Sequence, residues 1–264
     1  MSMSPDTPSR IVLCEGAHDR AFWGKLLERR FGCSGATDPA GTHSAGRAKG
    51  GYRTASDKFI RFLVKDGGPT WQDVRSELTG AATRPIEEIV LCLDLDTEDE
   101  FPDFQQSRKQ RKQDMLRLGE SVRLVDARPL TECWDDATLT AVFPIASQSA
   151  PTRISVALWG VSMAHQPGIP KKQTLERVAC AAVAAAYPDT AEPVSRWLAS
   201  RPQPPVHSKH EHKAFAASYM AGWYAKRDYQ GFFQAVWEDR AIAEQLERLL
   251  KTTGTWAVME RVAA

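Results

Sequence analysis

Five acidic residues follow an apolar run near the middle of the chain, and the first of them have types and spacing that suit a metal ion. The run, residues 89–93, is rich in β-branched and aliphatic side chains, which is typical of a buried strand. Asp94 and Asp96 come next, and strand alternation would place both on one side. Neighbouring carboxylates repel unless a cation lies between them, and oxygen ligands favour Mg²⁺. The alternative is a solvated acidic loop after a strand.

A second acidic residue of interest follows the first apolar run of the chain. Residues 10–14 predict a buried strand that ends in Glu15 and Gly16, and a helical repeat of apolar side chains begins a few residues later. A strand, a glycine turn and a helix are how a parallel α/β unit begins. Ligands bind at the carboxyl ends of strands in such sheets, so Glu15 is a candidate for the same site as Asp94.

The rest of the chain predicts an α/β part followed by a helical part. The pattern indicates further strands at 121–125 and 154–159 and helices at 54–65, 71–78 and 104–118, and it predicts another helix that opens around 128–136. Residues 32–51 predict mostly loop. After residue 160 the patterns are helical, at 175–186, 191–200, 209–226, 241–250 and 256–262. We therefore predict two regions, 1–160 and 161–264.

Basic residues gather in two stretches that could face a polyanion. The net charge is only +1, so any nucleic-acid surface must be local. Solvated helix faces are the alternative for both stretches, and for the second the sequence alone slightly favours solvent. The candidates for contact with a nucleic-acid backbone are Arg47, Lys49, Arg53, Arg108, Lys109, Arg111 and Lys112.

The composition indicates a cytoplasmic protein. Residues 1–10 are polar and predict neither a signal peptide nor a membrane anchor, and no apolar run is long enough to span a bilayer. Five scattered cysteines without a Cys-x-x-Cys pair predict reduced thiols and no zinc site. His207, His210 and His212 lack the usual spacing of zinc ligands, because positions 207 and 210 precede or begin a helix, so we expect solvent-exposed histidines at the helix cap.

Two motifs in this order resemble those of the Toprim domain: residues 11–19, IVLCEGAHD, and residues 90–96, VLCLDLD. That family includes topoisomerases, bacterial primases, a ribosomal-RNA maturase and the OLD-family nucleases. The resemblance covers about residues 8–160 and is strongest to small stand-alone or OLD-like members. It implies an α/β fold with a Toprim-like parallel sheet flanked by helices, and a helical C-terminal part packed on it.

The resemblance also implies roles for individual residues. Glu15 would be a general acid/base or a metal ligand, and Asp94 and Asp96 would hold Mg²⁺, for which Mn²⁺ can substitute. Lys213 would be the catalytic lysine, with Lys209 as the second choice. The remaining metal candidates, matched by position in the motifs or after them, are Asp19, Glu98 and Glu132.

The expected activity is Mg²⁺-dependent cleavage of nucleic-acid phosphodiesters by a small stand-alone nuclease, in phage defence or RNA processing. The substrate would be DNA or RNA held through its backbone. The sequence leaves open whether a separate ATPase partner is required, because the chain itself contains no Gly-x-x-x-x-Gly-Lys-Ser/Thr motif. One alternative is a non-catalytic module that binds nucleic acid or a partner protein. Another is phosphoryl transfer to a small molecule such as a nucleotide.

Overall fold

A mixed sheet forms the centre of the protein, as the α/β prediction requires. The computed structural model describes residues 8–36, 51–65, 67–81, 85–97, 104–121, 134–144, 150–164, 166–200, 210–223 and 228–264. Within these residues eight strands form one sheet in the order β2-β3-β4-β1-β5-β8-β7-β6. Their bounds are β1 Pro8–Cys14, β2 Ser34–Ala36, β3 Gly51–Arg53, β4 Phe59–Val64, β5 Glu88–Asp94, β6 Trp134–Asp135, β7 Thr140–Phe143 and β8 Thr152–Trp159.

The four central strands, β4, β1, β5 and β8, are parallel. The strands outside them, β2 and β3 on one side and β7 and β6 on the other, pair antiparallel. Parallel strands buried on both faces are nearly continuous apolar runs, which is why β1 and β5 stand out in the sequence. All four central strands end at the same edge of the sheet, so the residues that follow them meet there.

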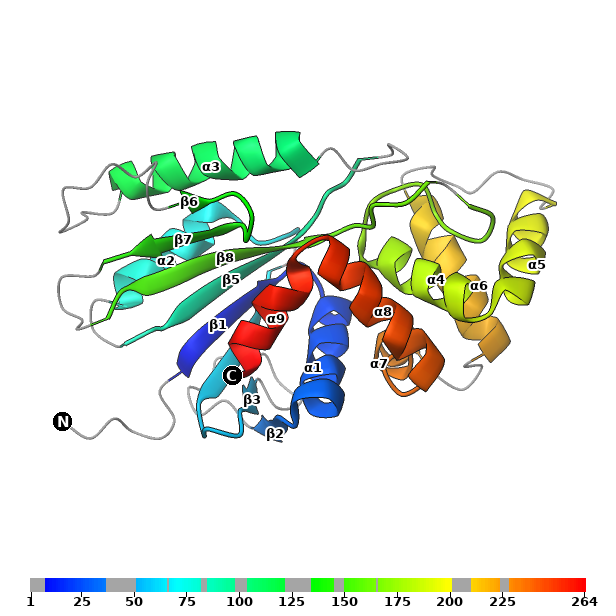
Figure 1. Cartoon of the computed structure of the whole chain (residues 1–264), viewed down its shortest axis with the longest axis horizontal. Helices are drawn as coiled ribbons and strands as arrows, with labels where there is room; N and C mark the ends of the chain where they lie inside the picture. The colour runs from blue at the N-terminus through cyan, green and yellow to red at the C-terminus, as the bar shows by residue number, and fades with distance from the viewer. Residues whose placement is uncertain are drawn as a thin grey trace.

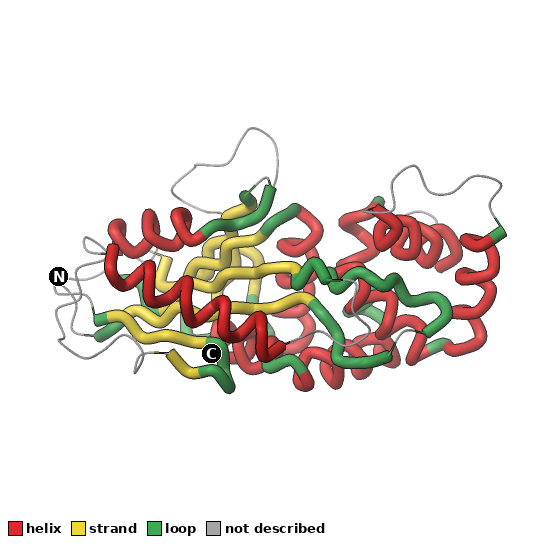
Figure 2. Tube along the Cα trace, turned by 90° about the horizontal axis from the view of Figure 1, so that it is seen from above, coloured by secondary structure: helices red, strands yellow, loops and turns green. Residues whose placement is uncertain are grey.

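Helices cover both faces of the sheet. Figure 1 shows α2 (Trp71–Ala81) and α3 (Phe104–Ser121) on one face, with α1 (Ala17–Phe31) and α9 (Thr255–Ala263) on the other. Seen from above, the remaining helices lie beyond one end of the strands (Figure 2). These are α4 Leu175–Ala186, α5 Pro188–Ala199, α6 Glu211–Trp223, α7 Tyr229–Ala235 and α8 Arg240–Thr252. None of the helices in the described ranges is long and apolar enough to cross a membrane.

Alternation along the central strands divides the apolar side chains into two clusters. Ile11 and Leu13 of β1 face α2 and α3, whereas Val12 and Cys14 face α1 and the C-terminal helices. The second cluster continues into α4, α7, α8 and α9, and Phe22 of α1 packs against Trp237 with ring centroids 5.1 Å apart. This cluster therefore crosses residue 160, and the division at that position stays a prediction.

Two predictions of secondary structure were wrong within the described residues, and a third is tested only in part. The helix predicted for 54–65 is strand β4, because Phe59, Ile60 and Phe62 pair beside β1 in the sheet core and their spacing fits either element. In the region predicted as mostly loop, residues 32–51, strand β2 occupies Ser34–Ala36 and strand β3 begins at Gly51, while residues 37–50 lie outside the described ranges. In the predicted helix at 128–136, Trp134–Asp135 is strand β6.

Other predictions of helices and strands agree with the structure. The helices at 71–78 and 104–118 and the strands at 10–14 and 154–159 are present, with slightly longer bounds. Ser121 ends α3, and the rest of the strand predicted at 121–125 is outside the described residues. Helix α7 was not predicted, because its seven residues are too few to show a clear period.

Candidate functional site

Glu15 and Asp94 lie at the tips of neighbouring parallel strands. Leu13 of β1 is opposite Leu91 of β5, so the two chains leave the sheet side by side. Asp94 is the last residue of β5 and lies opposite Trp159 of β8. The sequence prediction that these acids converge at one edge of the sheet therefore agrees with the geometry.

Asp94 is the most perturbed acid of this edge. Burial raises the pKa of its carboxyl well above the usual range, and the negative charges of Glu176, Asp19, Glu15 and Asp96 raise it further. The backbone N–H of Leu175, the first residue of α4, donates to Asp94 Oδ1 at 3.1 Å. One hydrogen bond from a helix N-terminus does not offset burial and four neighbouring carboxylates, so the pKa of Asp94 stays raised.

Asp19 has a structural role as well as a place in the acidic group. It lies in the first turn of α1, where the N–H of Gly16 donates to its Oδ2 at 2.8 Å. The side chain is buried, and burial raises its pKa to about 6 against the opposing effects of His18 and the Gly16 hydrogen bond. Its position at the helix start therefore has a structural reason, and it also brings a proton-exchanging carboxyl next to Asp94.

Asp96 reaches the site through a turn. Strand β5 ends at Asp94, and Asp96 has a φ of 57°, in the left-handed region. Alternation along the strand therefore does not extend to Asp96. Its backbone N–H donates to Gln173 O at 3.0 Å, and its Oδ1 lies 2.6 Å from Lys172 Nζ. The loop before α4 thus holds the acidic turn by both backbone and side chain.

Lys172 is a functional candidate that sequence reasoning missed. Partial burial opposes its charge, but Asp96, Asp94 and Glu15 together raise the pKa of the ammonium. The lysine predicted to be catalytic, Lys213, lies exposed on α6, and Lys209 is outside the described residues. The lysine that contacts the predicted acids is therefore Lys172. Nothing in the spacing of Lys171 and Lys172 marks either of them in the sequence.

Glu176 is a second residue that the sequence did not single out. It lies in the first turn of α4 and is 2% exposed, and Tyr229 Oη donates to its Oε1 at 2.8 Å. Burial alone would raise its pKa, but His18, His212 and the Tyr229 hydrogen bond outweigh that effect and leave it lowered. The helix dipole favours an acid in the first turn of any helix, so nothing in the sequence marked Glu176 as a functional residue.

His212 is buried, contrary to the expectation of an exposed histidine. It is 6% exposed, and burial lowers the pKa of its imidazole against the attraction of Glu176. Its Nδ1 has no hydrogen-bond partner within the described ranges. The prediction of exposure was wrong because α6 packs this side chain towards α4.

The predicted backbone-binding residues are only partly described. Arg47 and Lys49 lie outside the described residues, as do the metal candidates Glu98 and Glu132. Arg53 pairs with Asp57 at 3.1 Å and lies over the ring of Phe59. On α3, which also carries Arg108, Lys109 and Lys112, Arg111 pairs with Asp114 at 3.1 Å. Arg53 and Arg111 therefore have intramolecular partners that the sequence did not predict.

The donor set at the strand tips suits a hard cation. Glu15, Asp94 and Asp96 offer carboxylate oxygens only, which favours Mg²⁺ or Mn²⁺. No three or more His, Cys, Asp or Glu side chains of the described residues are grouped closely enough to hold a metal by themselves. Mg²⁺ commonly takes one or two carboxylates and keeps several waters, so this acidic edge fits it without a closed protein cage.

Comparisons with known proteins show the fold and no activity. No protein-family model and no curated protein matches the chain. The chain is similar to the crystal structure of a hypothetical protein from Pyrococcus horikoshii OT3, with a TM-score of 0.62 and 14% sequence identity. The alignment covers 97% of this chain and 99% of that chain. A likeness at this identity extends to the α/β architecture alone.

Proposed function

We propose that the protein is a Mg²⁺-dependent enzyme that cleaves the phosphodiester backbone of nucleic acid. The observation that carries the proposal is the meeting of Glu15 and Asp94 at neighbouring strand tips. There Asp19, Asp96 and Glu176 also act on Asp94 and raise its pKa. Buried repulsion of this kind destabilises the folded protein unless a cation relieves it, and perturbed acids gather at functional sites. The Toprim-like order of the two motifs supports the same proposal.

Each side chain has a role that follows from its position. Asp94, with Glu15 or Asp96, would hold Mg²⁺, which supplies charge neutralisation at the phosphate and a more acidic bound water. Lys172, held by Asp96, is placed to stabilise negative charge on a phosphate oxygen. Asp19 has a pKa of about 6 and so exchanges a proton near neutral pH, which suits a general acid or base.

Glu176 and its partners form the inner wall of this site. The carboxylate is held by Tyr229 from α7 and lies near His18 and His212, which come from α1 and α6. These contacts join three helices behind the strand tips and keep a negative charge next to Asp94. Glu176 therefore positions the acidic edge electrostatically and does not need to contact the substrate.

Cleavage assays on purified protein test the proposal. Labelled single-stranded DNA, single-stranded RNA and a duplex are incubated with Mg²⁺, with Mn²⁺ and with EDTA. We expect product only with a divalent metal, and we expect Asp94→Asn and Glu15→Gln to abolish it while their circular dichroism spectra match wild type. Glu192→Gln, an exposed acid on α5, is the control and should remain active.

Three outcomes would overturn the proposal. Wild-type rates in both Asp94→Asn and Glu15→Gln would remove the assigned acids from the reaction. Nucleic-acid binding that survives chelation, with no product at any metal concentration, would instead favour a non-catalytic binding module. Turnover of free nucleotides without dependence on polymer length would favour phosphoryl transfer to a small molecule.

A further inference from the structure

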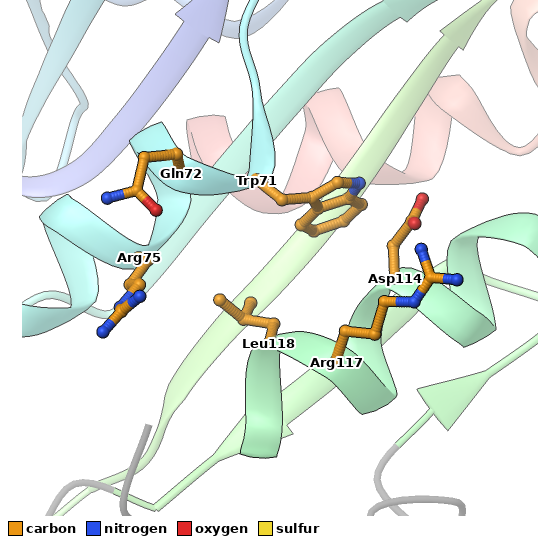
Figure 3. Close-up of a pocket in the computed structure, with 6 residues that line it drawn as sticks. All are labelled: Trp71, Gln72, Arg75, Asp114, Arg117 and Leu118. Atoms are coloured by element: carbon orange, nitrogen blue, oxygen red, sulfur yellow. The ribbon is translucent and has the colours of Figure 1, made fainter. Parts of the chain in front are cut away.

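A pocket opens between α2 and α3, on the face of the sheet opposite α1. It has a volume of about 240 Å³ and is lined by Trp71, Gln72, Arg75, Asp114, Arg117 and Leu118 (Figure 3). Drug-sized ligands occupy pockets of roughly 300–1,000 Å³, so this one suits a single ring or a single anionic group.

Two of the residues that line the pocket, Trp71 and Leu118, are apolar. Leu118 is buried, and the half-buried indole of Trp71 packs on the same apolar cluster as Leu93 and Leu95. Figure 3 shows Trp71 and Leu118 facing the space between the two helices. A partly exposed indole in such a position offers a stacking surface for a planar aromatic group. Leu93 and Leu95, which pack on this cluster too, flank Asp94 in the chain.

The rim of the pocket carries two arginine side chains. Arg75 from α2 and Arg117 from α3 are exposed, and neither forms an ion pair with a described residue. Asp114, the acid of the lining, already accepts from Arg111 and Gln110, each at 3.1 Å. Two guanidinium groups without an ion pair to a described residue, placed beside an indole, form a combination that binds a base and its phosphates.

A short connection ties this pocket to Glu15. The N–H of Lys65 donates to Cys14 O at 2.8 Å, and a Cβ placed on Gly68 would lie 3.8 Å from Glu15 Cγ. Trp71 follows Gly68 by three residues, so their Cα atoms are at most about 11 Å apart. A nucleic-acid strand rises about 3.4 Å per nucleotide, so a few nucleotides span this distance.

We propose that this pocket binds one base of a single-stranded nucleic acid whose backbone continues to the strand-tip acids. Trp71 stacks on the base, and Arg75 and Arg117 contact the adjoining phosphates. A base paired in a duplex does not present its face to the indole, so the pocket selects single strands or unpaired ends. The assignment of the polymer as substrate rests on the proposed function, whereas the binding itself does not require cleavage.

Binding is measured in EDTA by fluorescence anisotropy of a labelled single-stranded oligonucleotide, with the matching duplex and nucleoside monophosphates as competitors. We expect Trp71→Ala to weaken binding about 5- to 150-fold, the factor that corresponds to ~1–3 kcal/mol for one stacked base. Trp71→Phe should keep most of the affinity. Arg75→Ala and Arg117→Ala should each reduce the salt dependence by about one phosphate contact.

Trp197→Ala is the matched control, because Trp197 is 59% exposed on α5, away from the pocket. Equal binding by wild type, Trp71→Ala and both arginine variants would overturn the proposal, as would duplex binding as tight as that of the single strand. Competition by a nucleoside monophosphate as strong as by the oligonucleotide would overturn the assignment to a polymer. If wild type does not cleave nucleic acid but its binding still depends on Trp71, the proposed nuclease activity is wrong and the proposed base-binding pocket is supported.

Discussion

At the scale of single residues, the ionised carboxylate of Asp94 destabilises the folded protein. Its carboxyl is buried beside Glu176, Asp19, Glu15 and Asp96, and its one described hydrogen bond comes from the Leu175 N–H. Because its pKa is raised in the folded protein, ionisation at neutral pH destabilises the fold. Such strain is common where binding or catalysis requires a charge that the fold itself does not need.

Asp94→Asn should therefore stabilise the protein in the absence of metal. Removing about 1 kcal/mol of repulsion would raise Tm by about 2–4 °C in a chain of this size. The raised folded-state pKa fixes the sign: the destabilisation is present above that pKa and is lost as pH falls. Thermal unfolding in EDTA should show the gain at about pH 8 and little at about pH 4.

The matching experiment adds Mg²⁺ at about pH 8. We expect the cation to raise Tm of wild type and to have a smaller effect on Asp94→Asn, because ligand binding stabilises only the state that binds it. A lower Tm for Asp94→Asn at both pH values would contradict the interpretation that Asp94 is a repelled charge.

Lys172 is the second residue whose role can be tested alone. Removal of one group that stabilises developing charge commonly lowers kcat by about 10²–10³-fold, and we expect Lys172→Met to do so with KM little changed. Lys172→Arg should recover part of the rate, since it keeps the charge beside Asp96. Lys213→Met is the control on α6. Loss of activity in Lys213→Met alone would instead support Lys213, the lysine predicted from the sequence, as the catalytic lysine.

At the scale of elements, the exit from β5 decides where the second aspartate lies. The turn is held to the loop before α4 by two backbone hydrogen bonds, from Asp96 N–H to Gln173 O and from Gln173 N–H to Thr97 O. The left-handed φ of Asp96 is tolerated by Asp and Asn and disfavoured for β-branched residues. The aspartate at this position therefore fits the left-handed backbone conformation and also pairs with Lys172.

Substitutions at Asp96 can separate these two roles. Asp96→Asn should keep the free energy of unfolding within about 0.5 kcal/mol and lower the cleavage rate. Asp96→Val should lower the free energy of unfolding by about 1–2 kcal/mol because of the left-handed φ. Asp57→Val is the control, because Asp57 has a φ of 60° in the turn between β3 and β4. Denaturant unfolding and activity of all three variants check this. Equal stability of Asp96→Asn and Asp96→Val would argue against backbone strain at this turn.

At the scale of the whole molecule, the C-terminal helix closes the structure onto its first and central strands. Arg261 of α9 pairs with the buried Glu88 of β5 at 3.3 Å and donates to Ser155 of β8. Arg10 of β1 donates to Val262 O at 2.6 Å. Together with the apolar cluster that crosses residue 160, these contacts pack the helical region against the central strands.

Arg261→Ala tests this coupling. It leaves the carboxylate of Glu88, which is 3% exposed, without its ion pair, so we expect a loss at the lower end of ~3–5 kcal/mol in the free energy of unfolding. Far-ultraviolet circular dichroism and tryptophan fluorescence should report the same single transition in wild type. Arg248→Ala, an exposed arginine on α8, is the control. Two separate transitions in wild type would instead support independent regions on either side of residue 160.

The sequence by itself determined the strands that carry the first acids. A strand buried on both faces must be an uninterrupted apolar run, so 10–14 and 89–93 were recognisable, and the polar residues directly after them had to lie at the sheet edge. It did not determine β4, β2 and β3. The apolar spacing of β4 fits a helix as well as a strand, and the two short strands depend on pairing with it.

Only the tertiary structure decided which other charges join the site. Leu175, which donates to Asp94, is 81 residues away from it in the chain, and Lys172 and Glu176 flank that contact. They meet Asp94 because β8 pairs beside β5 and the chain returns from β8 to begin α4 at the strand tips. No local spacing encodes such a meeting. It follows from strand order and packing, and these are set by long-range burial of apolar surface.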